Sequence, residues 1–246
     1  MPTFFVASDD ITPPTICITG PLLQHLRQSL RLHSGDSLIV TDDRGIRYRT
    51  TVTDVTPQRV AGQIVDTQSA PPKTVPSLIL SLALLKGEKM DWVVQKVTEL
   101  GIERIVPVHA AHSVVKLRAD RIDHQRARWQ RIALEAAQQS ERWTVPSIEP
   151  PVTLPDLFAR YAACSSKNIL VERSTDSSLC MIPLPAGPDQ SIMIVLGPEG
   201  GWSQDELRLA REQGYRTISM GARILRAETA AVAAISILQS RLGELG

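Results

Sequence analysis

A proline-rich stretch, SAPPKTVP at residues 69–76, divides the sequence into two parts with different hydrophobic patterns. Proline fixes the backbone φ angle and carries no amide hydrogen, so this stretch disfavours both helix and strand. We therefore expect a linker here and two domains, one at residues 1–72 and one at residues 73–246. A chain of 246 residues is long enough for two modest domains.

The first part predicts a small β-barrel. Short runs rich in strand-forming residues alternate with turn signals such as Ser34-Gly35-Asp36. The expected strands are residues 15–19, 37–41, 48–52 and 60–65, and one helix is expected near residues 21–30. Strands at this spacing, interrupted by a single helix, are typical of a small barrel.

The second part alternates between apolar runs and amphipathic segments, which predicts an α/β domain. The expected strands are residues 78–84, 105–108, 168–171, 192–196 and 216–219. The expected helices are residues 90–100, 121–141, 204–213 and 228–242, and Gly101 is the expected end of the first. This alternation predicts a mostly parallel sheet with helices on both faces.

Composition excludes several classes of protein. Hydrophobic residues make up 43% and charged residues 22% of the chain, as in an ordinary globular protein. The sequence contains neither an apolar run long enough to span a membrane nor the pattern of a signal peptide. Its three scattered cysteines indicate neither a disulfide framework nor a zinc site, and we expect a cytoplasmic protein without a metal.

The segment LGPEGGWSQDE at residues 196–206 directly follows an expected buried strand. Its glycines let backbone approach a ligand closely, and Ser203 with Glu206 forms the pattern of a helix capping box. The loop lacks the lysine of a phosphate cradle and carries Glu199 instead. We therefore expect a ligand that offers positive charge or hydrogen-bond donors, unless the loop is a tight turn without a ligand.

Residues 219–230, SMGARILRAETA, follow the last expected strand. Arg223, Arg226 and Glu228 surround an apolar pair, and alanines give the next helix a flank of small side chains. Ligands of open α/β sheets lie beyond the carboxyl ends of the strands, so this segment is a second candidate site wall. The alternative is that Arg226 and Glu228 form a surface ion pair.

The net charge of +1 gives no global attraction for nucleic acid, but residues 116–131 carry six basic side chains against two aspartates. Such a cluster favours phosphate contacts, although a solvated helix face would look the same. Lys86 and Lys89 leave the same choice open. Glu135 and Arg142 share one helical stripe with Gln139, which either lines a site or faces solvent.

Taken together, these segments resemble the RsmE family of SPOUT-class RNA methyltransferases. The resemblance covers nearly the whole chain and rests on five segments: HLRQSLRLHSGD (25–36), LLKGEKMDWVVQKVTELGI (84–102), EAAQQSERWTVP (135–146), LGPEGGWSQDE (196–206) and MGARILRAETAA (220–231). Two family arginines are replaced, one near Thr3 and one at His112. Without this resemblance we would expect an ordinary unknotted sheet.

The resemblance implies a PUA-like RNA-binding barrel followed by an α/β domain with a deep trefoil knot, acting as a homodimer. It implies methylation of N3 of a uridine in 16S ribosomal RNA of the small subunit, with S-adenosyl-L-methionine as the cofactor. The cofactor would be held by residues from three strand ends: Val171, Glu172, Leu196, Gly197, Pro198, Glu199, Gly200, Gly201, Ser219, Met220, Gly221, Ile224, Leu225, Arg226 and Thr229. RNA would be bound by Arg27, Arg31, Lys86, Lys89, Lys116, Arg118 and Arg142.

Methyl transfer to uridine N3 requires loss of a proton, so the site must supply an acceptor or stabilise the anion. We expect Arg226 to hold the developing negative charge and name Glu135 as a candidate proton acceptor, with water as its alternative. Two other functions stay open. One is methylation of another ribosomal or transfer RNA site, and the other is a non-catalytic RNA-binding role in ribosome assembly.

Overall fold

The computed structural model describes residues 3–28, 30–115, 118–172 and 177–246. The chain divides into two compact units. The first comprises Met1–Pro72 with Ala137–Thr144, and the second comprises Lys73–Ala136 with Val145–Gly246. Between them, residues 70–76 form neither helix nor strand. The short segment 137–144 belongs to the first unit although it lies far along the chain.

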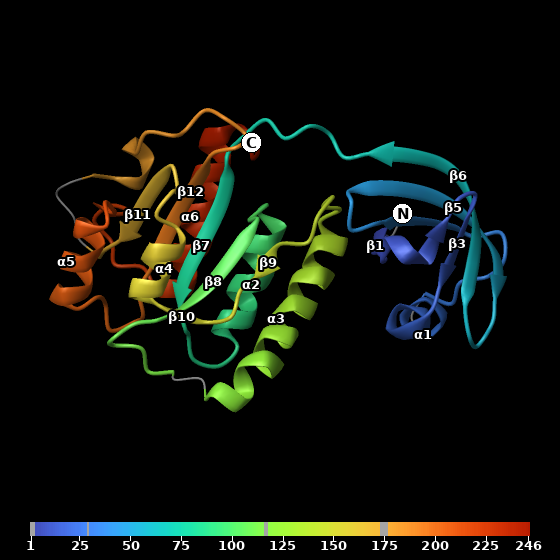
Figure 1. Ribbon diagram of the computed structural model, residues 1–246, viewed down its shortest axis with the longest axis horizontal. Coiled ribbons are helices and arrows are strands. Elements are labelled where there is room, and N and C mark those ends of the chain that lie inside the picture. Colours follow the sequence, from blue (N-terminus) through green and yellow to red (C-terminus); the bar gives the residue numbers. More distant parts are fainter. Residues whose placement is uncertain (1–2, 29, 116–117, 173–176) are drawn as a thin grey trace. The chain divides into compact units, whose positions relative to one another are not determined.

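The first unit is a six-stranded sheet that curls around one helix (Figure 1). Its strand order is β1-β4-β5-β6-β3-β2, and every pair is antiparallel except β1 with β4. Register shifts within the long β5–β6 pair allow the sheet to bend. The elements are β1 (Thr3–Phe5), β2 (Ile11–Thr12), β3 (Thr15–Ile18), α1 (Gly20–Gln28), β4 (Ser37–Thr41), β5 (Ile46–Val55) and β6 (Val60–Ser69).

The core of the first unit is formed by alternate residues of its strands together with α1. Leu38 and Val40 of β4 are fully buried, as are Val60 of β6 and Leu26 of α1. Because successive strand residues point to opposite faces, this alternation places one face of the sheet against the helix. The predicted PUA-like β-rich domain with a single helix is confirmed.

The second unit is a parallel sheet in the order β10-β8-β7-β12-β11-β13, with β9 paired to β8. Its strands are β7 (Ser77–Ala83), β8 (Arg104–His109), β9 (Ser147–Ile148), β10 (Val152–Thr153), β11 (Ser166–Leu170), β12 (Ser191–Leu196) and β13 (Arg216–Ile218). Its helices are α2 (Lys89–Glu99), α3 (Ala119–Gln139), α4 (Leu154–Arg160), α5 (Gln204–Glu212) and α6 (Ala227–Leu242). The predicted α/β architecture is confirmed, whereas the short elements β9, β10 and α4 were not predicted.

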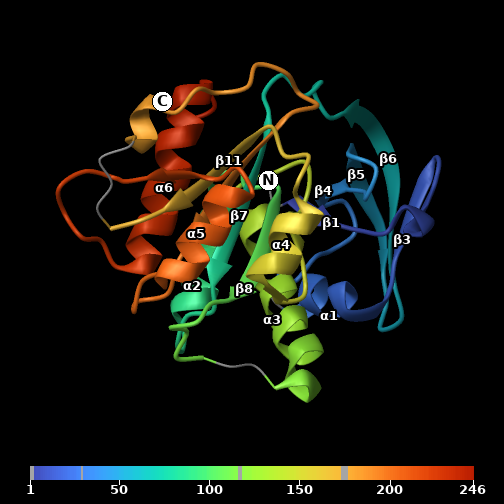
Figure 2. The same cartoon turned by 60° about the vertical axis from the view of Figure 1, so that its left-hand side comes forward.

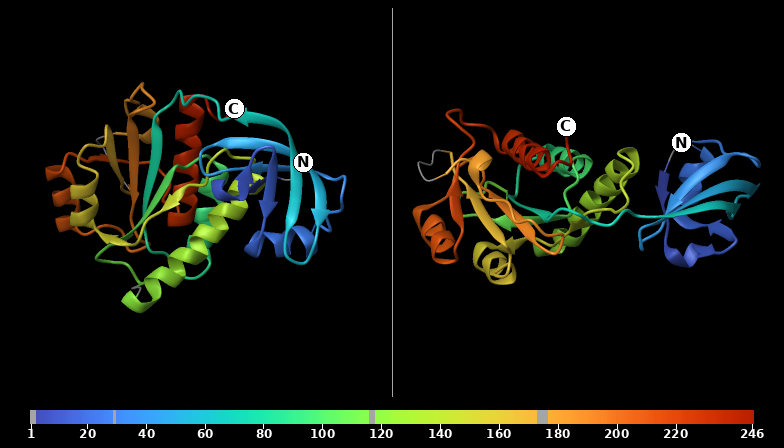
Figure 3. Two further views of the ribbon diagram at one scale, coloured as in Figure 1. Left: turned by 45° about the vertical axis from the view of Figure 1, so that its right-hand side comes forward. Right: turned by 90° about the horizontal axis from the view of Figure 1, so that it is seen from above.

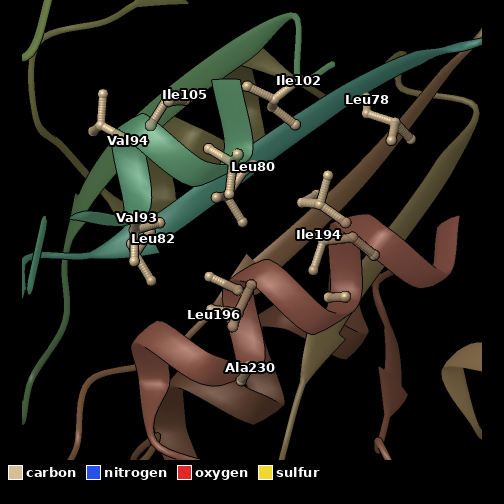
Figure 4. Packing of buried hydrophobic residues seen from close by; sticks show 14 of the residues in the cluster. Leu78, Leu80, Leu82, Val93, Val94, Ile102, Ile105, Ile194, Leu196 and Ala230 are labelled. Atoms are coloured by element: carbon tan, nitrogen blue, oxygen red, sulfur yellow. The ribbon is translucent and has the colours of Figure 1, made fainter. Parts of the chain in front are cut away.

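Helices cover both faces of this sheet, as the view from above shows (Figure 3). On β7, Leu80 and Leu82 belong to a core that includes residues of α2 and α6 (Figure 4). Ile79 and Ala83 of the same strand belong to a second core, which includes Phe158 of α4. Helices α4 and α5 lie side by side over that second face (Figure 2). The strands are therefore buried on both sides, which explains their continuous apolar runs.

The C-terminal segment contacts the connection between β11 and β12 at two places. Leu179 donates its backbone amide to the carbonyl of Ser219 at 3.0 Å. The guanidinium of Arg241, on α6, donates to the carbonyls of Leu179 and Ile182 at 2.9 and 2.8 Å. The trefoil knot expected from the resemblance stays a prediction. In the part of the chain that is described, no helix is long and apolar enough to cross a membrane.

Candidate cofactor site

A cavity of about 590 Å³ lies at the carboxyl ends of β11, β12 and β13. This is the edge at which parallel α/β sheets bind ligands. The cavity is lined by Leu170, Val171, Glu172, Leu196, Gly197, Pro198, Glu199, Gly200, Gly201, Trp202, Leu207, Met220, Arg223, Ile224, Leu225, Arg226, Ala227 and Ala230. Most of the residues expected to hold the cofactor therefore come together around one cavity. Ser219, Gly221 and Thr229, which were also expected there, do not line it.

The glycine loop, residues 197–201, is set between strand β12 and helix α5. The capping box is present: Ser203 Oγ accepts from the Glu206 amide at 3.2 Å, and Glu206 Oε2 accepts from the Ser203 amide at 2.8 Å. The second oxygen of Glu206 accepts from the amide of Ala111 at 2.8 Å. Glu206 thus stabilises the start of α5 and also attaches it to the loop that follows β8.

Trp202 lines the cavity although sequence reasoning did not select it. Its indole nitrogen donates to the carbonyl oxygen of Leu170 at 2.9 Å, which connects the glycine loop to the end of β11. Its ring lies so close to Gly197 that a Cβ at this position would meet Trp202 Cε2 at 2.9 Å. Glycine is needed at residue 197 because the backbone and the indole ring approach one another this closely.

His112, one of the two departures from the family pattern, lies against the glycine loop. Its Nδ1 is 3.1 Å from the carbonyl oxygen of Gly200 and 3.2 Å from that of Gly201. A Cβ added at Gly200 would meet the Cβ of His112 at 2.9 Å. A larger residue at position 200 would therefore displace the loop through His112, in addition to any effect on a ligand in the cavity.

Glu199 forms an ion pair with Lys89, at the start of α2. Lys89 Nζ lies 2.9 Å from Glu199 Oε1 and 3.6 Å from Glu228 Oε2, in the first turn of α6. Burial, the largest single influence, raises the pKa of the Glu199 carboxyl. The hydrogen bond from Lys89, a backbone hydrogen bond and the charge of Lys89 together outweigh it and hold the pKa below its ordinary value. Lys89, whose RNA contact stays a prediction, is paired with these two carboxylates.

The beginning of α6 forms another wall of the cavity. Arg226 is the residue that precedes the helix, and its carbonyl oxygen accepts from the Ala230 amide at 2.8 Å. The small side chains of Ala227 and Ala230, in the first turn of α6, also line the cavity. The side chains of Arg223 and Arg226 are exposed, and neither forms an ion pair with any residue that the structure describes. Two guanidinium groups are thus available at the cavity.

Glu135 does not line the cavity. It lies on α3 with its side chain 69% exposed and 4.0 Å from Arg131. Its role as a proton acceptor stays a prediction. Across residues 3–28, 30–115, 118–172 and 177–246, no group of acidic, histidine or cysteine side chains could hold a metal ion.

The residues expected to bind RNA are distributed over both units. Arg27 and Arg31 belong to the first unit and are exposed, and Arg142 belongs to it through segment 137–144. Lys86 is exposed in the second unit, where Arg118 pairs with Asp120 at 3.1 Å. Lys116 lies outside the described residues.

This combination of a PUA-like sheet and a parallel α/β sheet with a glycine loop defines a class, the two-domain RNA methyltransferases. Residues 72–239 match the model of an RNA methyltransferase domain, and residues 18–65 match that of an RNA methyltransferase PUA domain. The chain belongs to the family of ribosomal RNA small subunit methyltransferase E, as the following relatives establish.

The Bacillus subtilis protein of that name is 32% identical over 92% of this chain and 90% of its own length. The Synechocystis protein of that name is 31% identical over 96% of this chain and 77% of its own length. Among solved structures, the Neisseria gonorrhoeae ribosomal RNA small subunit methyltransferase E, bound to S-adenosyl methionine, superimposes with a TM-score of 0.86. It is 29% identical and the match covers 98% of both chains.

Proposed function

We propose that the protein transfers a methyl group from S-adenosyl-L-methionine to N3 of a uridine in 16S ribosomal RNA of the small subunit. The observation that carries this proposal is the cavity itself. The glycine loop, the end of β11 and the start of α6, which are distant in sequence, line one space. Its volume of about 590 Å³ is within the range of roughly 300–1,000 Å³ that is usual for small-molecule sites.

The residues present fit this cofactor. Leu170, Leu196 and Leu225 provide an apolar surface for a base, and the glycine loop exposes backbone groups for hydrogen bonds. Glu172 adds a carboxylate to the lining, near Gly201. A carboxylate and the absence of a loop lysine suit a ligand with a positive charge better than one with a row of phosphates. When bound, the cofactor supplies an activated methyl group on a sulfonium.

Arg226 is proposed to act on the acceptor. Uridine N3 carries a proton at neutral pH, and its ring becomes negatively charged as that proton leaves. A guanidinium at the cavity stabilises such a charge by hydrogen bonding and by electrostatic attraction. Arg226 is exposed at the start of α6, so it can reach a base that approaches the cavity from outside.

The first unit is proposed to bind the RNA, within residues 1–72, while residues 73–246 bind the cofactor and perform the transfer. We further propose that the protein acts as a homodimer on the small ribosomal subunit, in the cytoplasm. A second copy would also supply a second Glu135. This residue is the candidate proton acceptor, and in a single chain it does not line the cavity.

Calorimetric titration with S-adenosylmethionine tests the cofactor assignment, with ATP as the comparison ligand. We expect one site per chain with micromolar affinity for S-adenosylmethionine and at least 100-fold weaker binding of ATP. Tighter binding of ATP would show that the glycine loop is a phosphate site and would overturn the proposal.

A further inference from the structure

We propose that Lys89 is a positioning residue for the cofactor cavity, and that it holds the glycine loop and the start of α6 together through Glu199 and Glu228. This inference rests on the proposed function, because it concerns the site that would hold S-adenosylmethionine. It assigns Lys89 a role inside the protein, in place of the RNA contact expected from the sequence.

The three charged groups come from three separate parts of the chain. Lys89 begins α2, Glu199 lies in the middle of the glycine loop, and Glu228 lies in the first turn of α6. The ammonium of Lys89 is 2.9 Å from Glu199 Oε1 and 3.6 Å from Glu228 Oε2. Glu199 and the neighbours of Glu228, Ala227 and Ala230, line the cavity, whereas Lys89 does not. One ammonium, which is not itself part of the lining, thus links two walls of the cavity.

The charge balance explains why this link matters. Glu199 and Glu228 both approach one cation, so removing the cation leaves two carboxylates facing each other. Two carboxylates that share one ammonium repel each other once it is removed, and this repulsion acts to separate the two walls. Glu228 is the more sensitive partner, since its side chain is only 15% exposed and its Oε2 is buried without a hydrogen-bond donor among the described residues. A buried carboxylate oxygen without a donor is costly unless a cation compensates it.

The same contacts argue against a primary role in RNA binding. A lysine that neutralises phosphate must leave its carboxylate partners, and here it would leave two of them. The hydrogen bond from Lys89 to Glu199 raises the pKa of the ammonium, because the pair stabilises its charged form. Lys86, three residues earlier, is exposed and forms no ion pair in the described part of the chain. It is the better candidate for an RNA contact in this segment.

The test compares Lys89→Met with Lys96→Met in the full-length protein. Lys96 lies on the same helix and also pairs with a carboxylate, that of Glu99, at 2.8 Å. Unlike Glu199, the partner of Lys89, Glu99 does not line the cavity. We expect Lys89→Met to raise the calorimetric Kd for S-adenosylmethionine at least tenfold, and Lys96→Met to leave it within twofold. Steady-state rates should show a raised KM for the cofactor with kcat largely retained at saturation, which a partly unfolded protein would not show.

A compensating variant separates positioning from a general loss of stability. Lys89→Met combined with Glu228→Gln, at a residue that does not line the cavity, removes one of the two carboxylates that repel. We expect its Kd for the cofactor to recover at least threefold relative to Lys89→Met. Lys89→Arg, which keeps the charge, should remain within about threefold of the unsubstituted protein.

The inference is overturned if Lys89→Met binds the cofactor normally, or if Lys89→Met with Glu228→Gln binds it no better than Lys89→Met alone. If Lys89→Met binds the cofactor normally but binds small-subunit RNA more weakly, Lys89 contacts RNA and does not position the cavity walls. These results are distinct from a failure of the proposed function, in which the unsubstituted protein itself would not bind S-adenosylmethionine.

Discussion

The indole nitrogen of Trp202 donates a hydrogen bond to the carbonyl oxygen of Leu170, at 2.9 Å. This bond joins the residue after the glycine loop to the last residue of β11, and both residues line the cavity. The walls of the cavity are thus held by specific contacts between distant parts of the chain, and these contacts can be tested individually.

Trp202→Phe keeps an aromatic ring in the cavity but removes the hydrogen bond. A net contribution of about 1 kcal/mol is usual for such a bond, so we expect roughly a fivefold rise in the Kd for S-adenosylmethionine. Trp202→Ala should cost more, since the packing against Gly197 is lost as well. Calorimetry measures both. Equal affinities for Trp202→Phe and the unsubstituted protein would show that the bond to Leu170 does not shape the site.

Gly200→Val is expected to abolish measurable cofactor binding. The added Cβ would lie 2.9 Å from the Cβ of His112 and 3.4 Å from its carbonyl oxygen, so the loop must move. Gly187→Ala is the matched control, because no atom lies closer than 3.6 Å to the Cβ that it would add. An unchanged Kd for S-adenosylmethionine in Gly200→Val would show that the glycine loop does not form part of the cofactor site.

Arg226→Ala is expected to lower kcat about 100-fold or more while the Kd for S-adenosylmethionine changes less than fivefold, because the guanidinium acts on the charge of the acceptor base. Single-turnover rates with saturating cofactor give the first value and calorimetry gives the second. Lost cofactor binding with no separate rate defect would contradict this role.

RNA binding by the first unit is tested with Arg27→Gln and Arg31→Gln. Each substitution removes one exposed cation. If both contact phosphates, the double variant should bind small-subunit RNA more weakly and with a shallower dependence on salt, by about 0.7 per lost contact on a single strand. The Kd for the cofactor should not change. An unaltered salt dependence would place the RNA contacts elsewhere.

Alkaline pH should destabilise the second unit through Tyr161. Burial, followed by the hydrogen bond to Glu149, raises the pKa of Tyr161 to about 12. A raised folded pKa means that the stabilisation is complete below pH 10, the ordinary pKa, and is lost as the pH rises toward 12. We expect the unfolding free energy to fall by about 2 kcal/mol over this range, as a shift of this size implies. Tyr161→Phe should remove about this much of the alkaline loss in denaturant titrations. The remainder comes from Tyr215, whose pKa is also raised by burial.

Much of the cavity was predictable because its parts are local in sequence. Glycines after an apolar run indicate a close turn at a strand end, and Ser203 with Glu206 marks the start of a helix within four residues. The strands of the parallel sheet were predictable for a similar reason, since burial on both faces makes each one a continuous apolar run.

The contacts that hold the cavity together were not predictable, because they join residues far apart in the chain. Lys89 and Glu199 are separated by 110 positions and His112 and Gly200 by 88, and no periodicity relates them. Trp202 offered one signal, its place directly after the glycines, but a single aromatic residue at such a position is as consistent with a core as with a site. Segment 137–144 was assigned to the second domain from the sequence, whereas the first unit includes it by its contacts.

Methylation of N3 of a uridine in small-subunit RNA can be measured on the product itself. The purified protein is incubated with S-adenosylmethionine and small ribosomal subunits from a strain that lacks the enzyme. Nuclease digestion and mass spectrometry of the 16S RNA then identify the product. We predict one 3-methyluridine per RNA molecule, formed about 100-fold more slowly or slower still with Arg226→Ala. A methyl group on a ribose oxygen or on transfer RNA, or no transfer despite cofactor binding, would contradict the account.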